Sequence, residues 1–465
     1  MASTTKVKTV FACGSCGTTS PKWMGKCPGC SEWNTMVEEV ISAGTRAQQV
    51  AGVPAGERMS ASGKRLASKP TRVQDVSGER DARLLLPDPE LNRCLGGGLV
   101  DGALILIGGE PGSGKSTLML QTVLQLDKPV LYVSGEESEK QIKLRADRVP
   151  GENQKCYLLA ETDTAAIAKH VKELQPAIIV IDSIQTMSSP LIDSAPGSVS
   201  QVRETTNVFQ RIAKDSGIPV FIIGHITKEG SIAGPKLLEH IVDVVLQFEG
   251  DRNYSYRVLR TLKNRFGSTD ELGIYEMRSD GMNPITNPSQ LLLAQHEDEL
   301  SGSAVAATLE GMRPLLIEVQ ALVSTAVYST AQRSATGFDT RRLNMLLAVL
   351  EKRCGFAFAQ NDVFLNIAGG IRVDDPAIDL SIVGALISSF DDVAIPKRDA
   401  FAGEVGLSGE VRAVSRIDQR IQEADKHGFE RIFVSKYNKG LDTVHSGIEV
   451  VQIKRVEDLV RLLFQ

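Results

Sequence analysis

The chain has 465 residues, of which 42% are apolar, and a formal net charge of −5 at pH 7. This length predicts two or three domains rather than a single core. The slightly acidic balance excludes binding of nucleic acid through overall basic charge, so any polyanion must be met locally. No apolar run approaches the roughly 18 to 20 residues that span a bilayer, and the N-terminus lacks a secretory apolar region. We therefore expect a cytoplasmic protein with no membrane partner.

Four of the seven cysteines lie between residues 13 and 30, in the pattern C-x2-C-x10-C-x2-C. Two thiolate pairs at this spacing are typical of one tetrahedral zinc ion, and a segment this short needs the metal in order to fold. The predicted zinc ligands are Cys13, Cys16, Cys27 and Cys30. The remaining cysteines stand singly, so no disulfide framework is expected. We expect a four-cysteine zinc finger over residues 1–35.

The zinc finger is also cationic and aromatic, since Lys22, Trp23, Lys26 and Trp33 lie within it. These side chains suit single-stranded nucleic acid, whose bases stack on aromatic rings. The two tryptophans equally suit a structural role in which they cover the metal. The sequence leaves both interpretations open.

A linker is predicted over residues 36–72, where Ala, Gly and Ser dominate and large apolar side chains are few. Residues 1–72 hold ten Lys and Arg against four Glu, a local balance of +6 that leaves −11 for the rest of the chain. Basic charge is thus concentrated at the front of the sequence.

Residues 73–285 alternate short apolar runs with amphipathic segments, as α/β folds do. Continuous Val and Ile runs predict strands that are buried on both faces of a mostly parallel sheet. The expected strands are at residues 103–109, 129–135, 156–160, 177–183 and 220–227. Beyond Val242 the pattern predicts antiparallel hairpins added to this sheet. A second α/β unit is expected over residues 286–465.

The segment GEPGSGKST matches G-x-x-x-x-G-K-[ST] and lies between an expected strand and an expected helix. In this context the backbone N–H groups of a glycine-rich turn surround the phosphates of a nucleotide. The predicted nucleotide-binding residues here are Gly109, Glu110, Pro111, Gly112, Ser113, Gly114, Lys115, Ser116 and Thr117. We expect Lys115 to reach the β and γ phosphates of ATP and Ser116 to bind Mg²⁺.

Acidic and polar residues follow three of the other expected strands. Asp182 ends one strand and is predicted to hold Mg²⁺, directly or through water. Glu136 follows another strand and is our predicted general base, although Glu137 could exchange roles with it. His225 is predicted either to sense the γ phosphate or to be an ordinary buried histidine.

This layout resembles the RecA-like ATPase core. With the four-cysteine finger, GGEPGSGKST (residues 108–117) and KNRFG (residues 263–267), the whole chain resembles the bacterial RadA, or Sms, family of DNA repair and recombination proteins. The resemblance implies a DNA-dependent ATPase and helicase. It would form a homo-hexameric ring and move along single-stranded DNA to drive branch migration.

The same resemblance implies ATP, Mg²⁺ and Zn²⁺ as cofactors. The implied partners are single-stranded and branched DNA and a RecA-type recombinase filament. One alternative is an ATP-switched scaffold that binds DNA without unwinding it. A signalling ATPase of the KaiC type is another, and the zinc finger argues against it.

Two cations of the KNRFG motif, Lys263 and Arg265, have no acidic residue nearby in that stretch. RecA-like ATPases bind nucleotide between subunits, so the resemblance implies that both cations act on a neighbour's γ phosphate, with Arg265 as the better arginine finger. A solvated strand end or contacts to DNA phosphates are the alternatives. In the segment at residues 227–236, Lys228 and Lys236 are predicted to contact DNA.

Residues 362–429 resemble the proteolytic domain of Lon, an α/β unit of the ribosomal S5-like kind. In this alignment the catalytic serine falls on Ala377 and the lysine on Asp418, so no nucleophile or amine remains and proteolysis is not expected. The retained fold suggests assembly and DNA binding. Arg341 and Arg342, on one predicted helix, either follow duplex phosphates or belong to a solvated helix surface.

Overall fold

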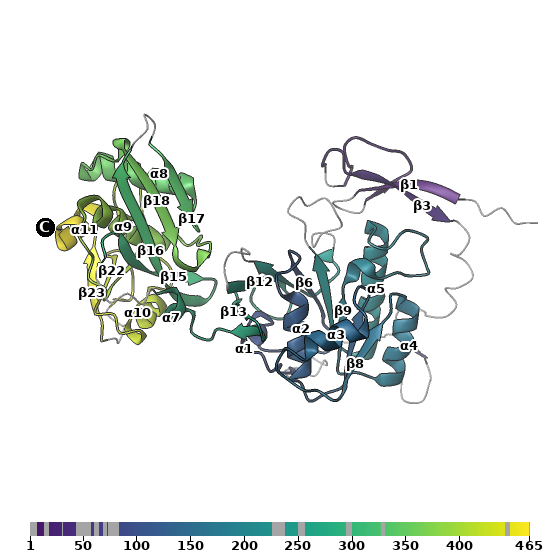
Figure 1. Cartoon of the computed structure of the whole chain (residues 1–465). Helices are drawn as coiled ribbons and strands as arrows, with labels where there is room; N and C mark the ends of the chain where they lie inside the picture. The colour runs from purple at the N-terminus through teal and green to yellow at the C-terminus, as the bar shows by residue number, and fades with distance from the viewer. Residues whose placement is uncertain are drawn as a thin grey trace, which may run out of the picture. The chain divides into compact units, whose positions relative to one another are not determined.

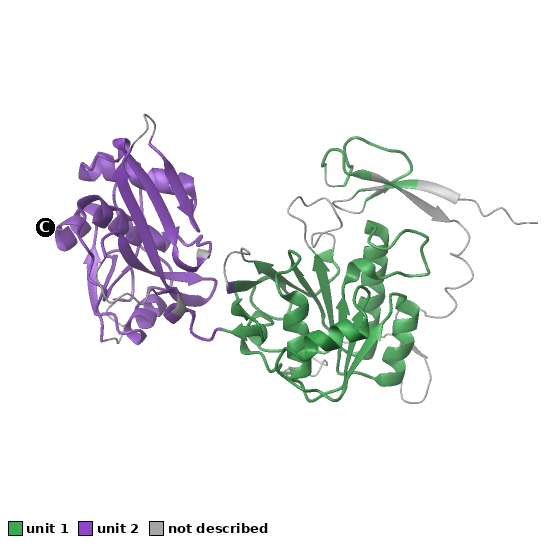
Figure 2. Ribbon diagram, viewed as in Figure 1, with its two compact units in different colours: residues 1–249, 257–284 green, residues 250–256, 285–465 purple. Residues whose placement is uncertain are grey.

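The computed structural model describes residues 7–13, 18–29, 31–42, 57–59, 65–67, 72, 83–225, 238–249, 256–293, 300–326, 331–441 and 447–464. The chain divides into two compact units (Figure 2). Unit 1 comprises residues 1–249 and 257–284, and unit 2 comprises residues 250–256 and 285–465. None of the helices in these described ranges combines the length and hydropathy needed to cross a bilayer.

The N-terminal segment forms a three-stranded antiparallel sheet in the order β2-β1-β3. Its strands are β1 (Val7–Cys13), β2 (Thr19–Ser20) and β3 (Met36–Ser42). β3 pairs with β1 along its whole length, from Cys13 opposite Met36 to Val7 opposite Ser42. The sheet therefore continues to Ser42, beyond residue 35, where the sequence predicted the finger to end. A separate antiparallel pair, β4 (Glu57–Met59) and β5 (Arg65–Ala67), lies within the predicted linker.

The main sheet of unit 1 has nine strands in the order β14-β13-β12-β11-β6-β10-β9-β7-β8. Figure 1 labels β6, β8, β9, β12 and β13 of this sheet. Its first six strands in the chain are β6 (Leu104–Gly109), β7 (Val130–Ser134), β8 (Cys156–Ala160), β9 (Ile178–Asp182), β10 (Val220–His225) and β11 (Val244–Glu249). These six strands are paired in parallel. The predicted mostly parallel RecA-like sheet is confirmed.

Helices cover both faces of this sheet. They are α1 (Pro89–Cys94), α2 (Lys115–Leu124), α3 (Glu139–Ala146), α4 (Thr164–Leu174) and α5 (Val199–Ser216). α1, α2 and α3 pack with alternate strand residues such as Ile105 in one core, and α4 and α5 pack with Leu104 and its neighbours in the other. Burial on both faces explains the continuous apolar runs of these strands.

The last three strands form an antiparallel meander, β12 (Tyr256–Asn264), β13 (Leu272–Arg278) and β14 (Gly281–Pro284). The sequence predicted hairpins for everything beyond Val242. β11 differs, because it pairs in parallel with β6 on one side and antiparallel with β12 on the other. It therefore belongs to the parallel sheet, and the chain reverses only after it.

Unit 2 is built on a seven-stranded mixed sheet in the order β17-β18-β16-β15-β19-β22-β23. The strands are β15 (Ser303–Glu310), β16 (Arg313–Thr325), β17 (Arg333–Thr336), β18 (Asn361–Ile367), β19 (Asp399–Ala402), β22 (Arg431–Ser435) and β23 (Glu449–Ile453). A short hairpin of β20 (Glu404–Val405) and β21 (Val411–Arg412) stands beside it.

The helices of unit 2 are α7 (Pro288–Leu292), α8 (Thr340–Val349), α9 (Asp379–Asp391), α10 (Ile417–Lys426) and α11 (Val456–Phe464). α8, α9 and α11 pack on one face of the sheet, and α10 packs on the other. A π-turn, Leu350–Cys354, continues α8. The predicted second α/β unit is thus present.

Two ion pairs join elements of unit 2 through buried carboxylates. Arg420, of which 1% of the side chain is exposed, donates to Asp375 Oδ2 at 2.6 Å and to the carbonyl of Ala307 at 2.9 Å. Arg342 donates through Nε and Nη2 to the two carboxylate oxygens of Asp379, at 2.7 and 2.6 Å. This bidentate pair gives Arg342 a structural role that the sequence did not suggest, while its contact with DNA stays a prediction.

Substituting Arg420 tests the energetic importance of the first pair. Burial raises the pKa of Asp375, but the hydrogen bond and charge of Arg420 outweigh this and hold that pKa below its usual range. Arg420→Ala leaves the carboxylate buried without its cation, and we expect it to lower the free energy of unfolding of unit 2 by about 3–5 kcal/mol. Hydrogen exchange of unit 2 peptides at increasing urea concentrations measures this free energy.

Arg398→Ala is the matched control, since its pair with Glu430 is exposed on both sides. We expect no measurable change from it. Equal effects of the two substitutions would contradict a structural role for the buried pair.

Candidate functional site

The glycine-rich loop connects the end of β6 to the start of α2, and its backbone requires glycine at two positions. Gly112 and Gly114 have φ angles of +81° and +101°, which disfavour any residue with a Cβ. At Gly114 a Cβ would also lie 3.0 Å from Met282 Sδ and 3.1 Å from Met277 Cε. The two glycines thus allow the tight turn that places the N-terminus of α2 directly after β6, an arrangement suited to binding phosphate.

Lys115, the first residue of α2, lies folded against this loop. Its ammonium donates to the carbonyls of Gly109 at 2.9 Å and Glu110 at 2.8 Å, and only 3% of the residue is exposed. Burial lowers the pKa of Lys115 to about 8, although Asp182 and Glu136 act in the opposite direction. The amine is therefore a cation at neutral pH, positioned beside the phosphate-binding N–H groups.

Asp182 ends β9 at the same edge of the sheet. Parallel register aligns Asp182 with Ser134 of β7 and with Ile223 of β10, close to the end of β6. The fully buried Tyr132 donates its hydroxyl to Asp182 Oδ2 at 2.6 Å. Arg145 Nη2 lies 4.0 Å from the same oxygen. These contacts fix one oxygen and orient the carboxylate, which could hold a hard cation such as Mg²⁺ together with Ser116.

The two consecutive glutamates after β7 have different surroundings. Glu136 Oε1 accepts a hydrogen bond from Ser183 Oγ at 2.7 Å and lies 3.9 Å from His225 Nε2. Glu137 instead forms an ion pair with Arg145, whose Nη2 lies 2.6 Å from Glu137 Oε2. A hydroxyl thus orients Glu136 beside Asp182, whereas Glu137 is paired with a guanidinium of α3.

His225 ends β10 next to Glu136 and is half-buried. Burial, and then the charge of Lys115, lowers its pKa below the usual value for histidine. Its Nδ1 is buried and has no hydrogen-bond partner among the described residues. The imidazole is therefore expected to be neutral at pH 7, and it lies at the edge of the site rather than in a core.

Sequence reasoning missed Tyr132, Arg145 and Ser183 at this site. Ser183 was detectable, because it directly follows Asp182 in the chain. Tyr132 reads as an ordinary residue of a buried strand, and Arg145 as one of several charges on α3. Their roles depend on which strands are neighbours in the sheet, and spacing along the chain does not give this.

Lys263 and Arg265 lie near the opposite end of the strands, where β6 begins. Asn264 pairs with Val244, which in turn lies beside Ile105 near the start of β6, whereas the glycine-rich loop follows the end of β6. The five steps along β6 from Leu104 to Gly109 correspond to about 16 Å at the usual rise of a strand. The two cations are therefore directed away from the phosphate loop of their own chain.

Both cations contact the segment that precedes β11. Lys263 donates to the carbonyls of Glu239 and, at 2.9 Å, Val242, and burial lowers its pKa. Arg265 Nη1 lies 3.3 Å from Oδ1 of the buried Asp243, and 53% of the Arg265 side chain stays exposed. An acidic partner thus exists within the chain, 22 residues before Arg265, where the sequence offered no signal of it.

Of the predicted zinc ligands, Cys13 and Cys27 are described, and both are almost fully buried. The N–H of Gly29 donates to Cys27 Sγ at 3.3 Å, as an amide does to a thiolate ligand. Two buried thiols, one of which accepts an amide hydrogen bond, fit a zinc site. Cys16 and Cys30 lie outside the described residues, and the ranges that are described contain no complete cluster of metal ligands. The predicted DNA contacts Lys228 and Lys236 also lie outside the described residues.

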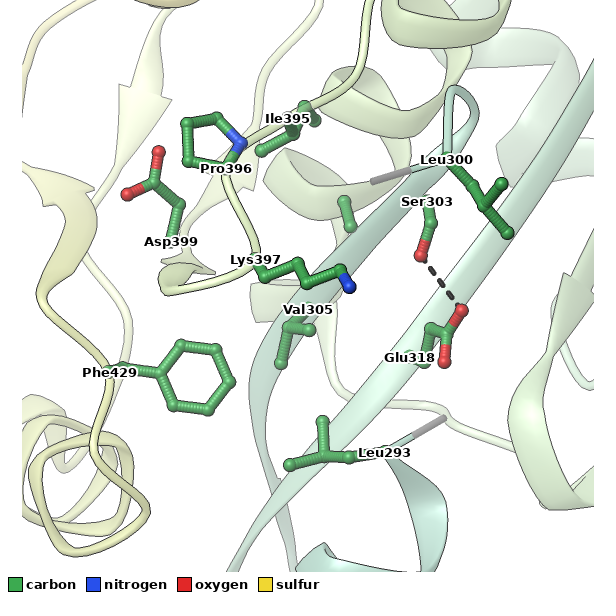
Figure 3. Close-up of a pocket in the computed structure, with 11 residues that line it drawn as sticks. Leu293, Leu300, Ser303, Val305, Glu318, Ile395, Pro396, Lys397, Asp399 and Phe429 are labelled. Atoms are coloured by element: carbon green, nitrogen blue, oxygen red, sulfur yellow. Dashed lines mark hydrogen bonds between the residues drawn. The ribbon is translucent and has the colours of Figure 1, made fainter. Parts of the chain in front are cut away.

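In unit 2, Ala377 is fully buried in a short 3-10 turn, and Asp418 is exposed in the first turn of α10. A separate pocket of about 190 Å³ lies elsewhere in this unit (Figure 3). Its walls include Phe429 and Ile395, and the side chain of Lys397 extends into it. Neither Ala377 nor Asp418 is among the described residues that line this pocket, so the pocket does not lie at the positions of Lon's catalytic serine and lysine.

Family models match three parts of the chain. A model described as an AAA domain matches residues 67–231, one described as a rubredoxin metal binding domain matches residues 11–38, and one described as subunit ChlI of Mg-chelatase matches residues 319–438. The crystal structure of the RadB recombinase is 23% identical with a TM-score of 0.35, covering 43% of this chain and 98% of that chain.

Curated relatives match almost the full length. DNA repair protein RadA of Bacillus subtilis (strain 168) is 50% identical over 460 residues, which are 98% of each chain. DNA repair protein RadA of Halalkalibacterium halodurans is 48% identical over 460 residues, 98% of this chain and 99% of that one.

The parallel sheet, the glycine-rich loop and the acidic edge define a RecA-like P-loop ATPase. It is joined to a zinc ribbon and to a domain of the ChlI or Lon-like kind. Given the identity and coverage of its relatives, the chain belongs to the RadA family of DNA repair proteins.

The two glutamates can be distinguished by isosteric substitution. We expect Glu136→Gln to lower kcat for ATP hydrolysis by roughly 10²- to 10⁴-fold, as loss of a general base does, with ATP binding retained. Glu137→Gln removes only the ion pair with Arg145 and should keep most of the turnover. Steady-state hydrolysis and binding of a fluorescent ATP analogue provide the two measurements. The reverse ranking of the two variants would assign the base to Glu137.

Proposed function

We propose that this chain is a Mg²⁺-dependent ATPase in which each site is completed by Lys263 and Arg265 of an adjacent subunit. The proposal rests on the position of these cations, which lie near the start of β6, whereas the phosphate loop of the same chain follows its end. In a ring of identical subunits, the cations of one subunit can face the phosphate loop of the next. A partly exposed guanidinium then supplies positive charge where negative charge develops in the transition state.

Within one subunit, each residue has a distinct task in hydrolysis. The loop amides and Lys115 bind the phosphates, and Ser116 with Asp182 would hold Mg²⁺. When bound, Mg²⁺ neutralises phosphate charge and orients the terminal phosphate. Glu136, held by Ser183, orients the attacking water and accepts its proton, and His225 contacts the terminal phosphate. The ion pair of Glu137 with Arg145 favours Glu136 over Glu137 in the role of base.

The proposed cellular task is translocation along single-stranded DNA during branch migration of recombination intermediates. The support for it is family membership, since the relatives are named as DNA repair proteins. We infer that a hexameric ring surrounds the strand, that the segment at residues 227–236 contacts it, and that unit 2 joins the subunits and contacts duplex DNA. The four cysteines of the ribbon would hold zinc, which supplies folding free energy when bound.

Mixing two inactive variants tests the shared site. Lys115→Ala removes phosphate binding but keeps the cations, and Arg265→Ala keeps the phosphate loop but removes one cation. When equal amounts assemble at random, about one quarter of the interfaces contain both intact parts, so we expect the mixture to recover up to about one quarter of wild-type ATPase activity. Each variant measured alone should show almost no ATPase activity.

A matched control replaces Arg265→Ala in the mixture with the double variant Lys115→Ala/Arg265→Ala. This mixture forms no complete interface and should remain inactive. Absence of recovery in the first mixture, with mixed assembly confirmed by mass measurement, would contradict action between subunits.

A further inference from the structure

Two large aromatic side chains are exposed on the zinc ribbon. Trp23 and Trp33 are 55% and 70% exposed, and they are the only tryptophans in the chain. Exposing both indoles on so small a module is unfavourable unless they meet a ligand, because tryptophan buries the largest apolar area of any residue.

Neither indole belongs to the buried cluster around the two described cysteines. The buried core of the described part of the ribbon consists of Cys13, Cys27 and Met36, with Phe11 packed against them. Phe11 and Met36 thus provide the apolar contacts of Cys13 and Cys27 in this cluster. Neither tryptophan is thus buried in the cluster that holds the two described cysteines, which leaves both indoles accessible to a ligand.

Local contacts hold the indoles near each other. A Cβ placed on Gly25 would lie 3.7 Å from Trp23 Cη2 and 3.7 Å from Trp33 Cζ3, so both six-membered rings border the same point. A β-bridge pairs Lys26 with Trp33, and the N–H of Asn34 donates to the carbonyl of Gly25 at 2.7 Å. Backbone pairing therefore holds the segment that carries Trp33 against Gly25 and Lys26.

Positive charge accompanies the rings. Lys26 Nζ lies 5.9 Å from the centroid of the Trp33 ring, in a cation–π contact, and Lys22 directly precedes Trp23. Glu32 is the only acidic residue among residues 18–36. Indoles flanked by ammonium groups combine a stacking surface for bases with contacts for phosphates. A duplex hides the faces of its bases, so this chemistry favours single strands.

We propose that Trp23 and Trp33 form a single-stranded DNA contact, in which bases stack on the indoles while Lys22 and Lys26 meet the phosphates. The proposal rests on the proposed action on single-stranded DNA and assigns part of that binding to the ribbon. It needs neither ATP hydrolysis nor contacts between subunits, so it can fail while the ATPase proposal stands.

Tryptophan fluorescence of the full-length, zinc-loaded protein reports on this contact directly, because both indoles lie in the ribbon. We expect an oligothymidylate to quench the fluorescence in the absence of ATP. An abasic oligonucleotide of equal length carries the same phosphates without bases and should produce little quenching. Equal quenching by the two polymers, or no quenching by oligothymidylate at saturation, would overturn base stacking.

Substitution provides the second test. Trp23→Leu/Trp33→Leu should weaken binding of a labelled oligothymidylate by roughly tenfold or more, measured by anisotropy. Trp23→Phe/Trp33→Phe retains aromatic faces and should recover most of the affinity. Zinc content and the DNA-free ATPase rate are measured for each variant to show that the ribbon and the ATPase core are intact. Unchanged DNA affinity of the leucine variant would contradict the proposal and leave the indoles to a protein partner.

Discussion

The reversal of chain direction after β11 separates Lys263 and Arg265 from the phosphate loop of the same chain. β11 runs parallel to β6, and β12 runs antiparallel to β11, so the strand that carries the two cations ends where β6 begins. The phosphate loop follows the other end of β6. Hydrogen bonds along the three strands fix this register, and no side-chain rotation can bring the cations across the length of the sheet. Within a single subunit the two cations therefore cannot meet the phosphate loop.

The phosphate-binding edge shows how the fold organises charge before any ligand arrives. Burial lowers the pKa of Lys115, and the nearby carboxylates Asp182 and Glu136 counter this effect. Asp182 is held by Tyr132, and Glu136 by Ser183, so each acidic group is oriented by a different hydroxyl. Preorganised groups of this kind need little rearrangement during reaction, which is the main source of electrostatic catalysis. At the other end of the strands Arg265 is held less firmly, since about half of its side chain is exposed.

Much of this arrangement could be predicted from the sequence. Continuous apolar runs identified the core strands, and the glycine-rich motif located the loop, because both depend on local chemistry. The parallel pairing of β11, the continuation of the ribbon to Ser42 and the contact of Arg265 with Asp243 could not be predicted. Each depends on which distant segments become neighbours, and spacing along the chain does not encode this.

The concentration dependence of ATP hydrolysis tests the shared site most directly. Specific activity is measured while the protein is diluted through the range in which its assemblies dissociate, with the mass distribution recorded on the same samples. We predict that the rate per subunit falls in step with the assembled fraction, because in a lone subunit the two cations cannot reach the phosphate loop. A purely monomeric sample that hydrolyses ATP at the full rate per subunit would contradict it.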